Sequence, residues 1–299
     1  MTVMLLGRNG QVSRELQRTL LPFGSLDVFG RDRLDLEKPE TISAALREAA
    51  NAAVIANAAA FTQVDQAETN SAVAFAVNRD AVGILAQQAL ERDALLLHYS
   101  TDYVFNGRKT APYVETDETD PLNVYGQSKR GGELAITGSR CKHLVFRTSW
   151  VFSADGDNFI KTILRLAHER PQLRVVADQF GAPTSAELIA DVTALAVAGY
   201  RRGGLPDGIY HLTAGGRTSW HGLACHVVRR AIDIGFEPKA GPDDIEPITT
   251  AEFPRPAARP MNSSLDCHAL SSRLGLSLPD WTVHVDRMLD QLRKRGWKP

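Results

Sequence analysis

Tyr125 and Lys129 are the two residues whose types and spacing most directly indicate chemistry. Residues four positions apart share a helix face, so the phenol and the ammonium can point into one site. Reduction of a ketone needs a hydride from a nicotinamide and a proton for the developing alkoxide. A tyrosine with an ordinary pKa of about 10 donates slowly near neutral pH unless a neighbouring cation lowers its pKa. The pair therefore fits a reductase, although an exposed helix face would carry the same pattern.

Hydroxyl groups stand at the end of a predicted strand that should lie beside this helix. The strand ends in His98-Tyr99-Ser100-Thr101, and a doubly wound sheet binds its ligands at the carboxyl ends of its strands. A hydroxyl of Ser100 or Thr101 beside the tyrosine can hydrogen-bond the substrate carbonyl oxygen as that oxygen gains charge. The neighbouring strand ends in Asn57-Ala58-Ala59-Ala60, whose small side chains leave room for a cofactor.

Two glycines, Gly7 and Gly10, stand between an apolar run at 3–6 and a helical pattern at 11–21. Glycines there allow a tight turn and let backbone N–H groups approach a pyrophosphate at the helix N-terminus. The pattern is G-x-x-G rather than G-x-G-x-x-G, and Ser13 replaces the glycine usual for helix–strand packing. Two glycines alone are weak support, but this placement near the N-terminus favours a dinucleotide-binding turn.

The second predicted strand leads into Phe29-Gly30-Arg31-Asp32, where the adenosine ribose of a dinucleotide would lie. An arginine there can pair with the 2′-phosphate of NADPH, whereas Asp32 could serve NADH. A solvated surface charge pair explains the same residues equally well. The sequence therefore leaves the choice between the two cofactors open.

Strand and helix patterns alternate along the first half of the chain, which predicts an α/β fold with a doubly wound parallel sheet of Rossmann type. The expected strands are apolar on both faces and span residues 3–6, 26–29, 53–56, 94–99 and 144–147. The expected helices between them span residues 11–21, 41–50, 72–92 and 124–137.

The rhythm loosens beyond about Pro171, where strands are expected at 173–176 and 209–212 and helices at 186–198 and 220–234. The six prolines between residues 235 and 260 exclude long helices and indicate ordered loops of a smaller C-terminal lobe. We therefore predict a dinucleotide-binding domain at 1–170 with a returning segment at about 207–236, and a substrate-binding lobe at 171–206 and 237–299.

The composition argues against several classes of protein. Its 34 basic and 35 acidic side chains nearly cancel, which gives no electrostatic reason to expect nucleic acid or an anionic membrane surface as partner. The three cysteines are widely spaced and include no Cys-x-x-Cys pair, which argues against a disulfide framework or a zinc site. No apolar run reaches the roughly 18 residues that a membrane span needs. We expect a cytoplasmic protein.

Seven segments, spread nearly from end to end, carry a resemblance to a known family. They are MLLGRNGQV (4–12), NAAAFTQVDQAE (57–68), HYSTDYVF (98–105), PLNVYGQSK (121–129), FRTSWVF (146–152), DQFGAPT (178–184) and RPMNSSLD (259–266). These segments resemble the dTDP-4-dehydrorhamnose reductases of the extended short-chain dehydrogenase/reductase superfamily. The resemblance implies NAD(P)H-dependent reduction of the C4 ketone of dTDP-4-dehydro-L-rhamnose to dTDP-L-rhamnose, the last step of dTDP-rhamnose biosynthesis.

The same resemblance implies roles for individual residues. Tyr125 would donate the proton, Lys129 would lower its pKa and bind ribose, and Thr101 would assist at the carbonyl. With the glycine turn and Arg31 added, the candidate cofactor residues are Gly7, Gly10, Gln11, Val12, Arg31, Asp35, Leu36, Ala58, Ala59, Ala60, Tyr125 and Lys129. The candidate substrate residues are Thr101, Asp102, Trp150, Gln179 and Arg259.

Some members of the family are similar in forming a magnesium-bridged homodimer, which implies Glu15 and Glu187 as candidate metal ligands here. A further acidic residue would come from the C-terminal helix, but this chain has Gln291 at the position expected to be acidic. The departure weakens the expectation of Mg²⁺ and of a metal-dependent homodimer.

Two alternative functions fit the same residues. A nucleotide-sugar epimerase would use Tyr125 and Lys129 with tightly retained NAD and would consume no reduced cofactor. A non-catalytic NADP-binding regulatory subunit would not need the complete set, yet Thr101, Tyr125 and Lys129 are all present. The complete set favours the reductase.

Overall fold

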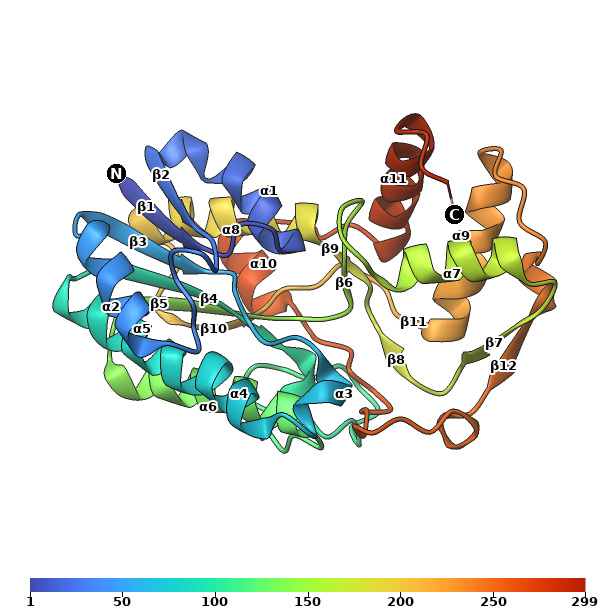
Figure 1. The fold of residues 1–299 in the computed structure, drawn as a ribbon, viewed down its shortest axis with the longest axis horizontal. Helices are drawn as coiled ribbons and strands as arrows, with labels where there is room; N and C mark the ends of the chain where they lie inside the picture. The colour runs from blue at the N-terminus through green and yellow to red at the C-terminus, as the bar shows by residue number, and fades with distance from the viewer. Residues whose placement is uncertain (299) are drawn as a thin grey trace.

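The computed structural model describes residues 1–298 and has two parts, a domain built on a six-stranded sheet and a smaller lobe beside it (Figure 1). The sheet is parallel throughout and its strand order is β10-β5-β4-β3-β1-β2. The strands span Thr2–Leu6 (β1), Ser25–Phe29 (β2), Ala52–Asn57 (β3), Leu95–Thr101 (β4), His143–Thr148 (β5) and Gly208–His211 (β10). The predicted doubly wound α/β fold is confirmed, with strand bounds within two residues of the predicted ones.

Helices cover both faces of this sheet, which explains why its strands are apolar on both sides. Successive side chains of a strand point to opposite faces, and in β1 Val3 and Leu5 enter one core while Met4 and Leu6 enter the other. The first core lies under α1 (Gln11–Thr19) and α8 (Ala186–Arg201). The second lies under α2 (Pro39–Glu48), α5 (Ala81–Glu91) and α6 (Val124–Ser139) (Figure 1). Among the described residues, no helix is long and apolar enough to cross a membrane.

The single helix predicted at 72–92 is interrupted by a π-helical turn. The stretch forms α4 (Ser71–Phe75), the π-helix η2 (Ala76–Asp80) and α5. Within η2, the Asn78 amide accepts a hydrogen bond from Phe61 N (2.9 Å) and donates to Ser128 Oγ of α6 (3.0 Å). A Cβ on Gly132 would overlap the Asn78 carbonyl oxygen, so only glycine lets α6 approach this closely. The turn therefore fixes the helix that carries Tyr125 and Lys129.

Short two-stranded sheets and three helices form the smaller lobe. The helices are α7 (Phe159–Glu169), α9 (Trp220–Asp233) and α11 (Trp281–Lys294). The sheets pair β7 (Leu173–Val176) with β12 (Ile245–Ile248) and β8 (Phe180–Gly181) with β11 (Thr218–Ser219). Three further short elements are β6 (Val151–Phe152), β9 (Thr184–Ser185) and α10 (His268–Leu274). α3 (Val64–Ala67) and the 3₁₀ turn η3 (Asp102–Val104) follow β3 and β4.

The expectation that residues 235–260 form only loops is wrong at β12. This strand contains Pro247 and still pairs in parallel with β7. A proline lacks the N–H that a central strand needs, but it is tolerated in an edge strand. Because the sheet has only two strands, every strand in it is an edge.

Three helices pack on the other side of the predicted domain boundaries, and one of them is α7, which lies inside the segment 1–170 assigned to the dinucleotide-binding domain but packs against α9. α8, which lies inside the segment 171–206 assigned to the lobe, packs against α1. α9, inside the returning segment 207–236, packs against α7 and α11 of the lobe (Figure 1). We therefore propose a division in which α8 and β10 belong to the sheet domain and α7, α9 and α11 to the lobe.

Candidate active site

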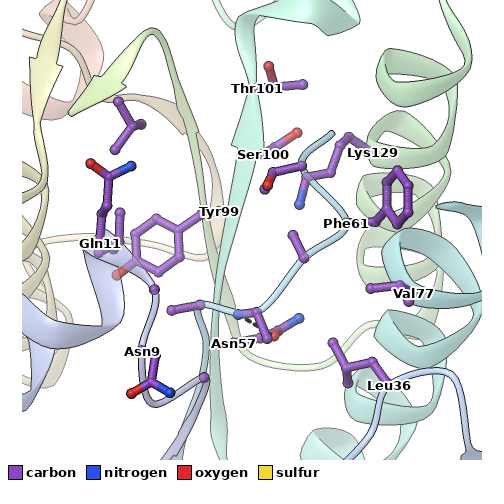
Figure 2. A pocket seen from close by; sticks show the side chains of 18 of the residues that line it. Asn9, Gln11, Leu36, Asn57, Phe61, Val77, Tyr99, Ser100, Thr101 and Lys129 are labelled. Carbon is purple, nitrogen blue, oxygen red and sulfur yellow. Dashed lines mark hydrogen bonds between the residues drawn. The ribbon is translucent and has the colours of Figure 1, made fainter. Parts of the chain in front are cut away.

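A cavity of about 1180 Å³ opens at the carboxyl ends of the central strands (Figure 2). This is the position at which a doubly wound sheet binds its ligand. All twelve candidate cofactor residues line it, together with Thr101, Asp102 and Trp150 from the candidate substrate residues. Gln179 and Arg259 line a neighbouring cavity of about 1280 Å³ in the lobe, and Trp220 borders both cavities.

The turn after β1 is shaped for close approach of backbone to backbone. Gly7 has a φ of +98°, which side chains rarely allow, and a Cβ on it would lie 3.4 Å from backbone atoms of Ala58. Helix α1 begins after Gly10 with no side-chain cap. Ser13 is buried and its hydroxyl bonds the Gly7 carbonyl oxygen, so it serves as the small packing residue. The uncapped N-terminus of α1 at the cavity fits an anionic pyrophosphate.

Arg31 borders the end of the cavity where the adenosine ribose would lie. Its guanidinium contacts Glu37 and lies 3.6 Å from Asp35 Oδ1. The Arg31 side chain is 74% exposed, so these are weak surface ion pairs that an added phosphate could replace. Asp32 pairs in the same way with Arg8 at 3.3 Å. This end of the cavity therefore presents both an arginine, which can pair with a 2′-phosphate, and an aspartate, which could serve NADH, as the sequence suggested.

Tyr125 and Thr101 lie together in the cavity. Asn123 caps α6 by accepting a hydrogen bond from Gly126 N (2.8 Å), and a Cβ on Gly126 would overlap the Tyr103 carbonyl oxygen. The start of α6 therefore sits directly on the backbone that follows Thr101. Burial raises the pKa of Tyr125 above its ordinary value, and its contact with Thr101 acts in the opposite direction. The phenol is protonated at neutral pH, as a proton donor must be.

Lys129 reaches the same space from one turn further along α6 (Figure 2). Its side chain is buried at 2% exposure, and its Nζ lies 3.3 Å from Nε2 of His98. Burial lowers the pKa of Lys129 to about 8, while the charge of Glu133 opposes that change. The pair predicted from the spacing thus shares one site, with the lysine close to its point of titration.

The two strand-end hydroxyls differ in what they contact. Ser100 Oγ donates to Glu133 Oε1 at 2.6 Å, beneath α6, where Glu133 also forms a buried ion pair with Arg147 (2.8 Å). Thr101 Oγ1 donates to Asp102 Oδ1 at 2.9 Å and lies beside Tyr125. Of the two candidates left open by the sequence, Thr101 is the hydroxyl positioned to meet a substrate carbonyl.

Asp102 and Trp150 form the side of the cavity nearest the lobe. Burial raises the pKa of Asp102 to about 6, against hydrogen bonds from Thr101 and from Ser149 Oγ (3.0 Å). Trp150 has a φ of +47° and stacks on Trp220 of α9 with ring centroids 3.5 Å apart. A non-glycine residue held in the left-handed region is strained, and such strain is concentrated at functional sites.

The neighbouring lobe cavity holds the other two candidate substrate residues. Gln179 Oε1 accepts a hydrogen bond from Trp220 Nε1 at 3.2 Å, which connects it to the stacked tryptophans. Arg259 grips Asp65 of α3 with two hydrogen bonds of 2.9 and 3.0 Å, and Arg255 binds the same carboxylate at 2.6 Å. These hydrogen bonds hold the pKa of Asp65 at about 2, with Arg259 the largest cause. Arg255 and Arg259 thus form a cationic edge of this cavity, and the Asp65 carboxylate links that edge to the sheet domain.

Glu15 and Glu187 lie near each other but away from both cavities. Glu187 accepts hydrogen bonds from Arg287 Nε (2.6 Å) and Gln291 Nε2 (2.7 Å). The pKa of Glu187 is lowered to about 2, with His284 the largest cause, followed by Gln291 and Arg287. Burial raises the pKa of Glu15, and the nearby Glu187 adds to that effect. Among residues 1–298, no three His, Cys, Asp or Glu side chains gather to hold a metal. Because an arginine and an amide already take up Glu187, this pair does not fit Mg²⁺.

Comparison with known proteins places the chain in a family. It matches the model described as RmlD substrate binding domain over residues 1–294. A dTDP-4-dehydrorhamnose reductase from Burkholderia thailandensis is 49% identical over 291 residues, which cover 95% of this chain and 97% of that protein. The chain belongs to the dTDP-4-dehydrorhamnose reductase family. The Escherichia coli K12 reductase is 45% identical over 98% of both chains.

Solved structures of dTDP-4-dehydrorhamnose reductases share the fold. The protein from Clostridium acetobutylicum is 31% identical, with a TM-score of 0.88 over 98% of this chain and 100% of that chain. The protein from Bacillus anthracis, solved in complex with NADP, is also 31% identical, with a TM-score of 0.86 over 97% and 99%. The family resemblance inferred from the sequence is confirmed.

Three residues of this reductase site were missed in the sequence. Trp220 begins α9, 70 positions after the Trp150 on which it stacks. Asp65 lies within the segment NAAAFTQVDQAE, but its partners come from the distant proline-rich stretch. His98, for which no role was predicted from the sequence, lies 3.3 Å from Lys129 Nζ. A buried histidine at the end of the same strand as the hydroxyls was the one local signal for the last of these.

Proposed function

We propose that this chain reduces the C4 ketone of dTDP-4-dehydro-L-rhamnose to dTDP-L-rhamnose with NADPH or NADH. The observation that carries the proposal is the gathering of Thr101, Tyr125 and Lys129 in one cavity with the uncapped glycine turn. Family membership supplies the substrate, because relatives that are 49% and 45% identical to this chain bear the name of that reductase.

The chain's own residues divide the chemistry between them. A nicotinamide bound in the cavity would supply the hydride for C4. Tyr125 donates its proton to the C4 oxygen as that oxygen becomes an alkoxide, and Thr101 Oγ1 hydrogen-bonds the same oxygen. Lys129, when charged, stabilises the tyrosinate left behind and binds the ribose hydroxyls. One hydride and one proton thus add across the carbonyl, and solvent returns the proton to Tyr125.

The cofactor lies along the carboxyl ends of β1 to β4 in this proposal. Gly7, Gly10, Gln11 and Val12 bind the pyrophosphate, while Ala58, Ala59 and Ala60 leave room beside it. Asp35 and Leu36 border the adenosine, where Arg31 can leave Glu37 to bind a 2′-phosphate. The NADP bound by the Bacillus anthracis relative supports NADPH as one cofactor of this chain.

The substrate would extend from the cofactor cavity into the lobe. Asp102 and Trp150 would contact the deoxysugar beside Thr101, and Trp220 marks the passage because it borders both cavities. Gln179 and Arg259 would bind the sugar or the diphosphate; the planar fork of an arginine suits the diphosphate.

The proposed mechanism assigns no step to magnesium, because Arg287 and Gln291 already bond Glu187. The homodimer bridged by that metal stays a prediction from the family resemblance. The cytoplasmic location stays a prediction from the cysteines.

The test is to incubate the pure protein with the ketosugar and either NADPH or NADH, following absorbance of the reduced cofactor and the sugar product by NMR. We expect one cofactor oxidised for each dTDP-L-rhamnose formed. The variant Tyr125→Phe should lose about 100- to 10,000-fold in kcat while its affinity for NADPH is kept. A sugar isomer formed with no net oxidation would identify an epimerase instead. Cofactor binding without any turnover would identify a regulatory subunit.

A further inference from the structure

A line of hydrogen bonds runs beneath the cavity from the cofactor-binding strand β3 to Lys129. Ala59 N donates to Asn57 Oδ1 at 3.2 Å, Asn57 Nδ2 lies 3.2 Å from His98 Nδ1, and Lys129 Nζ lies 3.3 Å from His98 Nε2. Asn57 and His98 are each 1% exposed, and Lys129 is 2% exposed. Asn57 and Lys129 also line the cavity, but His98 does not, so both nitrogens of its imidazole must be satisfied by these two neighbours.

The direction of each bond follows from the backbone. The N–H of Ala59 can only donate, so the oxygen of Asn57 must face it and the NH₂ group must face His98. Nδ1 of His98 is then an acceptor, and a neutral imidazole carries its hydrogen on Nε2. That hydrogen points at Lys129 Nζ, which must offer a lone pair. An ammonium at this position would set one N–H against another.

The charges around Lys129 agree with this direction. Burial, with Lys129 itself as the second cause, holds the pKa of His98 well below its ordinary range, so the imidazole is neutral. Glu133 is the anion one turn along α6, but Arg147 of β5 and Arg130 bind it at 2.8 and 3.3 Å. Tyr125, one turn back, is protonated. The protein thus has little negative charge left to hold an ammonium.

We propose that His98 is a positioning residue that favours the neutral amine of Lys129 in the free protein, so that dinucleotide binding near pH 8 takes up a proton at Lys129. The inference rests on the proposed function, because ribose hydroxyls and the anionic pyrophosphate are the groups that would favour the ammonium. The step adds one solvent proton to Nζ and changes no other bond. Near pH 8, Lys129 then carries its full charge, which assists Tyr125, only when the cofactor is in place.

The first test measures the tautomer of His98 in the free protein by ¹⁵N NMR of the imidazole nitrogens, assigned with the variant His98→Gln. At pH 9, where Lys129 in the free protein is mainly the neutral amine, we expect the hydrogen on Nε2. The variant Asn57→Asp offers Nδ1 an acceptor, so the hydrogen should move to Nδ1 and leave Nε2 free to accept from the ammonium. The control His143→Gln changes a buried histidine of β5 that bonds the Cys141 carbonyl, and should leave the tautomer alone. A hydrogen on Nδ1 in the unaltered protein would overturn the inference.

The second test counts protons by calorimetric titration of NADPH in buffers of different ionisation enthalpy. The pKa of Lys129 in the protein without cofactor is about 8. We therefore expect NADPH binding to take up about half a proton at pH 8, and this uptake should vanish toward pH 6. Asn57→Asp should reduce the uptake to near zero, and His143→Gln should keep it. NADPH binding with no uptake at pH 8 would overturn the inference alone. Failure of NADPH to bind at all would contradict the proposed function, while the NMR result would still decide the tautomer.

Discussion

Replacing Asp65 with asparagine should loosen the attachment of the smaller lobe to the sheet domain. One carboxylate accepts hydrogen bonds from Arg255 Nη2 (2.6 Å), from Arg259 Nη1 and Nη2 (2.9 and 3.0 Å) and from Ala257 N (3.2 Å). The segment that supplies these donors belongs to the proline-rich stretch, and Asp65 lies on α3 of the other part. The substitution Asp65→Asn would keep the shape of the side chain but remove its charge.

The expected loss in the free energy of unfolding follows from the pKa of Asp65. A lowering from 3.8 to about 2 corresponds to about 2 kcal/mol, at about 1.4 kcal/mol for each pKa unit. The side chain is 21% exposed, so screening by solvent reduces the expected loss to about 1–2 kcal/mol. Because the folded pKa is below the unfolded one, this stabilisation is complete above about pH 5 and is lost as pH falls through 3.8 toward 2.

The assay is urea unfolding at pH 7 and at lower pH, followed by tryptophan fluorescence and circular dichroism. The matched control is Glu48→Gln, which breaks an exposed surface pair with Arg33 and should cost less than about 0.5 kcal/mol. At pH 7 the free energy of unfolding should fall by about 1–2 kcal/mol in Asp65→Asn, and its difference from the unaltered protein should shrink toward pH 3. Equal losses of unfolding free energy in the two variants would show that the Asp65 carboxylate does not stabilise the attachment of the lobe. A loss in Asp65→Asn that does not change with pH would show the same.

Two further predictions concern the site and the acidic pair. Thr101→Val should lower kcat at least about 10-fold with little change in the affinity for NADPH, because it removes a hydroxyl that stabilises the oxyanion. Ser100→Ala should instead lower the stability of the protein, because Glu133 loses a buried hydrogen-bond donor. Steady-state kinetics and thermal unfolding of both variants distinguish the two effects. EDTA and added Mg²⁺ should leave both activity and sedimentation coefficient unchanged, because Arg287 and Gln291 neutralise or bond Glu187. A Mg²⁺-dependent change in either measurement would show that these side chains give way to a metal.

Local patterns were enough to predict the sheet and the catalytic pair. Strands such as β1 are recognisable because a parallel strand covered on both faces is apolar throughout, and a glycine turn follows it. Tyr125 and Lys129 could be paired because a spacing of four residues defines a helix face wherever the helix lies. The family segments then suggested candidate substrate residues that no periodicity could have indicated.

Contacts between distant residues could not be predicted in the same way. Asp65 and Arg259 are 194 positions apart, and nothing in either neighbourhood names the other. The hydroxyl of Ser100 lines the cavity but is bonded to the buried Glu133, 33 positions along the chain. The π turn at Asn78 leaves the apolar pattern of its helix nearly unchanged, so the sequence showed one helix where the structure has three segments.

The destination of the hydride shows directly whether this chain reduces C4 of the ketosugar. The protein is incubated with dTDP-4-dehydro-L-rhamnose and NADPH deuterated at the transferable C4 position of the nicotinamide, and the product is examined by NMR and mass spectrometry. We predict one deuterium at C4 of the sugar in dTDP-L-rhamnose, with Tyr125→Phe forming the same product far more slowly. Product without deuterium at C4, or deuterium kept in a cofactor that never leaves the protein, would contradict the account.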